Sequence, residues 1–155
     1  MSKDELKDYL ISLLNQCLSM VEEKEELTRV TVDKFFFPEG QRLEKFTRPI
    51  VGLFNPMVLF RRRKYREKDR EKYVEEQTKM YMSRFYDFRS KCISTLDDIK
   101  NGKLTNDEIV ISIKKYSEIK NQLFKPSISD RRAAHYLGRN EVFGQKAYII
   151  KKGKN

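Results

Sequence analysis

The chain has few of the residues from which catalytic and metal sites are usually built. Its 155 residues include no tryptophan, one histidine and two cysteines. The histidine, His135, has no recognisable nucleophile motif around it, and neither Cys17 nor Cys92 has neighbours at metal-ligand spacing. We therefore expect no cofactor and no metal ion, and we expect that the protein is not an enzyme.

Glycine and proline are also scarce, with six and four residues respectively. The glycines are dispersed, so the sequence contains no glycine-rich loop of the kind that cradles phosphate groups. Paired carboxylates such as Glu22 and Glu26 are common on acidic helices and do not by themselves indicate acid–base catalysis. Few chain breakers, together with a charged fraction of 36%, predict helices with solvated outer faces.

Long hydrophobic runs are absent as well. No apolar run approaches the roughly 18 residues needed to cross a membrane, and Asp4 and Glu5 stand where a signal peptide would be basic. Cys17 and Cys92 each fall on the apolar face of a predicted helix, which favours reduced core thiols over a disulfide or a metal site. These features predict a cytoplasmic, reducing location.

Two helices have clear sequence boundaries. Residues 4–22 follow a capping box formed by Ser2 and Glu5 and have apolar residues at steps of three and four. The acidic cluster that follows opposes the helix dipole, so fraying is expected after about Glu23 unless a basic partner lies there. Residues 106–124 follow a second capping box, Thr105 with Glu108, and must stop before Pro126.

The longest predicted helix runs from Pro56 to Lys100, without an internal proline or glycine and with Asn101-Gly102 as its stop. At that length, it is expected either to project from the body or to bend. Between residues 61 and 72 the only apolar side chain is Tyr65, so this part has no face to bury. The second half has an apolar seam that skips Thr78 and contains Val74, Tyr81, Phe85, Phe88, Cys92, Leu96 and Ile99.

The fold class that follows is mainly α: an antiparallel helical bundle around the long helix of residues 56–100. Residues 1–150 are expected to form one domain, and 151–155 a mobile basic tail. Minor extended segments are expected near 28–32 and 142–150. A short helix capped by Ser129 is expected to run through Leu137 and to end at Gly138.

Two further segments leave alternatives open. Residues 35–37 are three consecutive phenylalanines, which either anchor a loop in the core or form an exposed platform beside Lys34 and Arg42. Residues 41–54 have helical spacing, but Pro49 predicts a kink or break.

The net charge of +10 is distributed unevenly. Residues 61–72 hold eight basic and three acidic side chains, or +5, and residues 131–155 hold seven against one, or +6. Residues 1–27 hold three basic and seven acidic side chains, or −4. Two concentrated basic segments indicate an anionic partner.

The leading prediction is a non-catalytic protein that contacts the phosphate backbone of DNA or RNA without reading bases. The alternatives are a helical protein-interaction subunit or inhibitor that docks on a larger complex or self-associates, and peripheral binding to anionic membranes through Met57–Phe60 and the adjoining basic cluster. A solvated charged helix with no ligand also fits the pattern. The predicted phosphate contacts are Arg61, Arg62, Arg63, Lys64, Arg66, Arg70, Arg131, Arg132, Arg139, Lys151 and Lys152.

Overall fold

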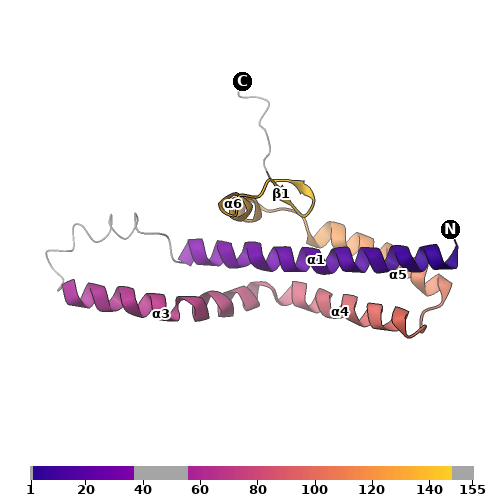
Figure 1. Ribbon diagram of the computed structural model, residues 1–155, viewed down its shortest axis with the longest axis horizontal. Helices are drawn as coiled ribbons and strands as arrows, with labels where there is room; N and C mark the ends of the chain where they lie inside the picture. The colour runs from indigo at the N-terminus through magenta and orange to yellow at the C-terminus, as the bar shows by residue number, and fades with distance from the viewer. Residues whose placement is uncertain (1, 37–55, 148–155) are drawn as a thin grey trace, which may run out of the picture.

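The chain is a long helical rod in a computed structural model that describes residues 2–36 and 56–147, with only the backbone described for 35, 36 and 56–68. These residues form five helices and one two-stranded sheet, as the predicted mainly α fold requires. Helix α1 (Lys3–Phe36) is the central helix of the rod, and the other four helices all pack against it. Helices α3 (Pro56–Tyr81) and α4 (Ser83–Lys100) follow one another antiparallel to it (Figure 1).

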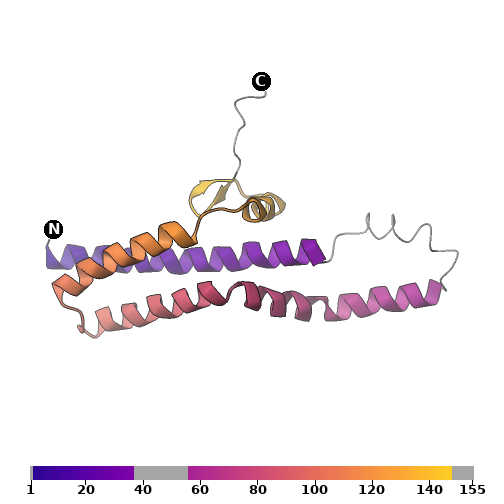
Figure 2. The same ribbon diagram turned by 180° about the vertical axis from the view of Figure 1, so that it is seen from behind.

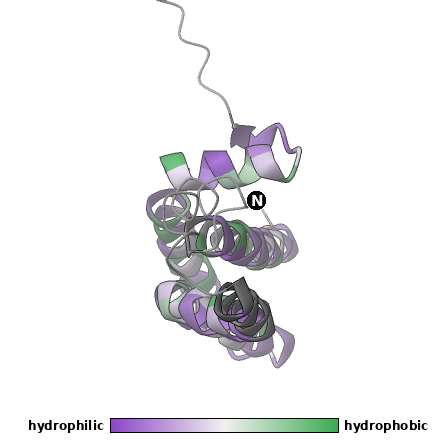
Figure 3. Cartoon of the chain, turned by 90° about the vertical axis from the view of Figure 1, so that its left-hand side faces the viewer, coloured by the Kyte–Doolittle hydropathy of each residue, from purple (hydrophilic) through white to green (hydrophobic). Residues whose placement is uncertain are grey.

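The remaining elements cover other sides of α1. Helix α5 (Asn106–Leu123) returns along α1 and lies in front of it in Figure 2, so α1, α4 and α5 enclose one half of the core. Helix α6 (Ile128–Tyr136) and the antiparallel hairpin of β1 (Glu141–Val142) and β2 (Gln145–Lys146) lie on the side of α1 away from α3 (Figure 1). Figure 3 looks along the rod and shows hydrophilic residues on much of the ribbon, with hydrophobic residues among them.

Helix α1 is longer than predicted, because it continues past the acidic cluster to Phe36. Buried Leu27 and Val32 extend the same apolar face that begins at Leu10, so core contacts outweigh both the acidic residues and the weak helix propensity of β-branched residues. The prediction of an extended segment at 28–32 is therefore wrong. The helix does not fray after Glu23, and the exception made for a basic partner applies, because Arg139 lies 2.6 Å from Glu26. The helix includes the backbone of Phe35 and Phe36, whereas Phe37, residues 41–54 and the tail lie outside the described residues.

Cys17 on α1 and Cys92 on α4 are both fully buried in the core and carry free thiols, as predicted. Interaction between the two thiols lowers the pKa of Cys17 and, together with burial, raises the pKa of Cys92. The Cys92 thiol is therefore held protonated, and burial of both side chains keeps them away from solvent.

The predicted long helix is helical throughout but divides at Met82, where the backbone leaves helical geometry at φ −91° and ψ 2°. Hydrogen bonds of 2.9 Å from Met82 N to the Thr78 carbonyl and from Tyr86 N to the Met82 carbonyl keep the two helices continuous. Thr78 and Met82 are buried, whereas Tyr81 is 55% exposed. The predicted place of Tyr81 in the seam is wrong, because the buried face follows steps of four through Val74, Thr78 and Met82.

Helices α4 and α5 meet as their boundary signals predict. Helix α4 ends at Lys100, Gly102 has φ of 68°, and both hydrogen bonds of the Thr105–Glu108 capping box are formed. The Tyr116 hydroxyl on α5 lies 2.6 Å from Thr95 Oγ1 and donates to the Lys91 carbonyl at 3.2 Å. The second half of the seam therefore packs against α5 as well as α1.

Replacing Tyr116 with phenylalanine should lower the free energy of unfolding by about 1 kcal/mol, because these hydrogen bonds are lost. Burial raises the pKa of Tyr116, so this group stabilises the fold fully below its unfolded pKa of 10.0 and progressively less as the pH rises above it. Urea unfolding from pH 8 to 11 should show a steeper loss of stability in the parent chain than in Tyr116→Phe. Parallel pH profiles would contradict this assignment.

Candidate nucleic-acid interface

The first part of the first basic segment, residues 61–66, lies on the part of α3 that extends past the end of α1. Residues 61–66, which include Arg61, Arg62, Arg63, Lys64 and Arg66, are all helical. In Figures 1 and 2, α3 continues well beyond the last turn of α1, and no other described helix runs beside this portion. Of the two alternatives that the sequence left open, a projecting or a bent helix, this part of α3 projects, with the basic run at one end of the rod.

Arg70, by contrast, holds two helices together. Its Nε lies 2.7 Å from Asp33 Oδ1 on α1, and both side chains are only about one-third exposed. This ion pair lies where α1 and α3 begin to pack side by side. Because Asp33 already balances its charge, Arg70 is a weaker candidate for phosphate binding than the sequence indicated.

A groove of about 770 Å³ lies beside this ion pair, between α1 and α3. Val30 and Val74 are its apolar residues, and charged side chains of both signs surround them. The charges are two arginines against three carboxylates, so the groove is not a site that would attract a polyanion. Its lining consists of Arg29, Val30 and Asp33 from α1 and Arg70, Glu71, Val74 and Glu75 from α3.

The second basic segment is partly neutralised by the acidic cluster of α1. Arg139 Nη2 lies 2.6 Å from Glu26 Oε2, and the backbone N–H of Phe143 donates to Glu23 Oε1 at 3.1 Å. The sequence showed an acidic segment near residue 25 and a basic one after residue 130, and the fold brings them together. Arg139 therefore fastens the C-terminal elements to α1.

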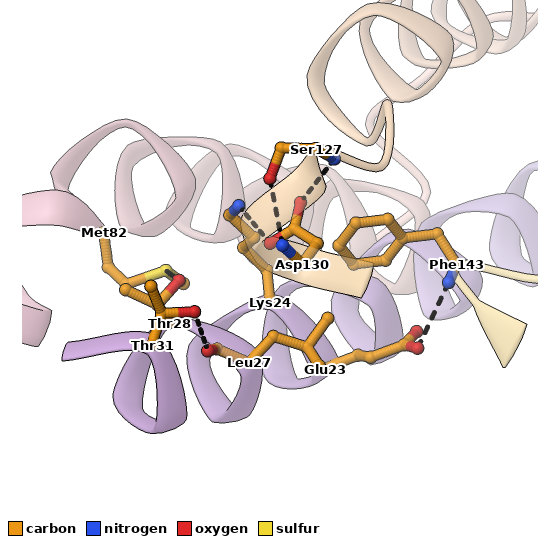
Figure 4. A network of polar contacts seen from close by, with 9 residues as sticks. All are labelled: Glu23, Lys24, Leu27, Thr28, Thr31, Met82, Ser127, Asp130 and Phe143. Atoms are coloured by element: carbon orange, nitrogen blue, oxygen red, sulfur yellow. Dashed lines mark hydrogen bonds and ion pairs between the residues drawn. The ribbon is translucent and has the colours of Figure 1, made fainter. Parts of the chain in front are cut away.

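The buried carboxylate of Asp130 is the centre of this attachment (Figure 4). It lies 2.7 Å from Lys24 Nζ and accepts a 3.0 Å hydrogen bond from the backbone N–H of Ser127. The Ser127 hydroxyl in turn accepts from the Asp130 N–H, which completes a capping box at the start of α6. The cap is therefore Ser127 and not Ser129, because only Ser127 has an acidic residue three positions later.

The hairpin after α6 turns at two residues with positive φ, Phe143 at 52° and Gly144 at 77°. This combination is typical of a tight two-residue turn, although phenylalanine rarely adopts it. Burial of the Phe143 ring, 5.3 Å from that of Phe124, and the bond to Glu23 offset the strain. The predicted extended segment at 142–150 is thus confirmed only as strands of two residues each, and residues 148–150 lie outside the described residues.

The other predicted contacts of the second segment are in different environments. Arg131 is half-buried, and its Nε is enclosed without a hydrogen-bond partner among the described residues. Arg132 is exposed on α6, as is His135. Lys151 and Lys152 lie outside the described residues.

A further group of cations was missed, because the second basic segment was taken to begin at Arg131 and these cations precede it. Residues 109–125 contain four lysines and one glutamate, for a net charge of +3. Three of these lysines are exposed, and α5 leads directly into α6. We call Lys114, Lys115, Lys125 and Arg132 the α5–α6 basic surface; all four are exposed, and none forms an ion pair within the described part of the chain.

Two absences among the described residues bear on other chemistries. Among residues 2–36 and 56–147 there is no group of three or more histidine, cysteine, aspartate or glutamate side chains placed to hold a metal ion. None of the helices in the same ranges is long and apolar enough to span a membrane. Comparison with known proteins adds no relative, because no protein family, no curated protein and no solved structure matches the chain.

Proposed function

We propose that the protein is a non-catalytic nucleic-acid-associated protein that contacts phosphates through the start of α3. The observation that carries this proposal is the position of Arg61–Lys64 on a helical segment beyond the end of α1, with no described carboxylate-bearing helix alongside. Cations in such a place can displace the counterions condensed on a polyanion, which is the main source of non-specific affinity for nucleic acid.

Residues 61–72 contain no serine, threonine, asparagine or glutamine, so charge dominates their contacts. Charged contacts to phosphates position a protein on a nucleic acid but carry no sequence information. Binding should therefore be similar for DNA duplexes of unrelated sequence and should weaken steeply with salt.

Replacing Arg61, Arg62, Arg63 and Lys64 together with glutamine should weaken binding to a random-sequence DNA duplex and flatten its salt dependence. Since two or three of these side chains can follow one phosphate backbone, the slope of log K against log salt should fall in magnitude by about 2 to 3. Fluorescence anisotropy titrations between about 50 and 200 mM salt would measure both effects.

A control with the same charge change is available at the other end of the rod. Lys3, Lys7, Lys100 and Lys103 lie at the start of α1 and around the end of α4 (Figure 1). Replacing these four with glutamine should leave the slope nearly unchanged. If the two variants lost the same affinity, net charge alone would explain binding, and absence of binding by the parent chain at about 50 mM salt would exclude the function.

A protein-interaction role is the second candidate, supported by the groove between α1 and α3. Its two charge signs around Val30 and Val74 suit a second copy of the chain, in which the same signs recur. Light scattering after size-exclusion chromatography would detect a dimer, and a dimer mass that survives high salt would indicate an apolar contact.

A further inference from the structure

The α5 lysines of the α5–α6 basic surface and the basic start of α3 lie far apart along the rod. Contact between Thr95 and Tyr116 places the middle of α5, with Lys114 and Lys115, beside the second half of α4. From Lys64 to Thr95, α3 and α4 span about 31 residues, which at ~1.5 Å per residue corresponds to about 45 Å. This separation is several times the Debye length of ~8 Å at physiological salt, so Lys114 and Lys115 are electrostatically independent of the start of α3. Helix α6, which carries Arg132, lies nearer to the start of α3, because Tyr136 contacts Lys34 close to the end of α1.

The two surfaces also lie on different sides of α1. Helix α6 is on the side of α1 opposite to α3 in Figure 1, and α5 crosses the face of α1 that Figure 2 turns toward the viewer. A straight duplex laid along the projecting part of α3 would therefore not lie against α6.

Some of the cations between the two surfaces lie beside carboxylates. Arg29 lies 3.3 Å from Glu25, and Arg89 lies 3.9 Å from the same side chain. Lys79 lies 3.5 Å from Glu75. Three other cations of this stretch, Lys72, Arg84 and Lys91, are exposed and form no ion pair among the described residues.

We propose that the protein bridges two nucleic-acid segments, holding one through the start of α3 and the other through the α5–α6 basic surface. This inference rests on the proposed function, because it requires that the first surface bind phosphates. Where both segments belong to one nucleic acid, binding of the first brings the second to a high effective concentration at the other site. The exposed lysines of α5 would then bind the second segment, whereas Arg61–Lys64 bind the first.

A two-duplex capture experiment tests the proposal. One random-sequence DNA duplex is immobilised on beads, the full-length protein is added at about 50 mM salt, and capture of a second, fluorescent duplex is measured. The parent chain should capture the second duplex. Replacing Lys114, Lys115, Lys125 and Arg132 with glutamine should reduce this capture by about tenfold, with protein retention on the first duplex within about twofold of the parent, since single-duplex affinity depends mainly on α3.

The outcomes separate this inference from the function on which it rests. Retention of the parent chain without capture of the second duplex would overturn bridging and leave the proposed function standing, whereas no retention would overturn both. Equal capture by the parent and the α5–α6 variant would also overturn bridging, since the named surface would then be dispensable. The variant at Lys3, Lys7, Lys100 and Lys103 has the same charge change and should capture as the parent does, with light scattering in the same buffer confirming a monomer.

Discussion

Replacing Asp130 with alanine should lower the free energy of unfolding by about 3 kcal/mol, because it breaks a largely buried ion pair and a helix cap together. The Asp130 carboxylate is 3% exposed, and Lys24 Nζ lies 2.7 Å away. Once the carboxylate is removed, the partly enclosed ammonium group of Lys24 loses its counterion. Urea denaturation followed by far-ultraviolet circular dichroism would measure the loss.

A second substitution separates the two contributions to this effect. Ser127→Ala removes the hydroxyl that caps α6 but leaves the pair of Lys24 and Asp130 in place, so it should cost only about 1 kcal/mol. If Asp130→Ala costs no more than Ser127→Ala, the ion pair contributes nothing beyond the cap. Amide hydrogen exchange should show the loss of protection in Asp130→Ala concentrated in residues 127–147, which this contact fastens to α1.

Replacing Phe124 with alanine should cost about 3 to 5 kcal/mol, the largest effect we expect from a single core substitution. Phe124 is buried at the end of α5, and its ring centroid lies 5.7 Å from that of Phe85, 6.0 Å from that of Phe88 and 5.3 Å from that of Phe143. One side chain thus joins α4, α5 and the hairpin. Truncation would leave a cavity where these three elements meet.

Two matched substitutions test whether this loss of stability comes from the buried volume of the Phe124 side chain. Phe124→Leu keeps most of the buried volume and should cost clearly less than alanine. Ile111→Ala truncates a side chain on the same helix that is 66% exposed, and it should change stability by no more than about 0.5 kcal/mol. A loss below about 1 kcal/mol for Phe124→Ala would mean that the three elements do not depend on this ring.

Features encoded within a few residues could be read from the sequence. The capping boxes of Ser2 with Glu5 and of Thr105 with Glu108 both form, and Gly102 and Pro126 mark the ends of helices as expected. These signals depend on backbone groups within one turn, so no distant residue is needed to interpret them. The Ser127 cap obeys the same rule and was open to prediction, because Asp130 stands three positions later.

The register of the buried face could not be read in the same way. Tyr81 and Met82 are both apolar enough for the core, and the break at Met82 decides that Met82 enters it and Tyr81 does not. Thr78 is buried although its hydroxyl finds no hydrogen-bond partner among the described residues. Packing against α1 sets these positions, and a single-helix pattern contains no information about the facing helix.

For this protein, the sequence by itself determined the helical class, most helix boundaries and the basic character of residues 61–72. Only the tertiary structure decided which charges remain available to a partner. Arg70 and Arg139 have carboxylates from α1 beside them, whereas Lys114, Lys115, Lys125 and Arg132 are exposed without one. The physical reason is that charge balance depends on distances of a few ångströms between side chains that are more than 30 residues apart in the chain, and folding sets those distances.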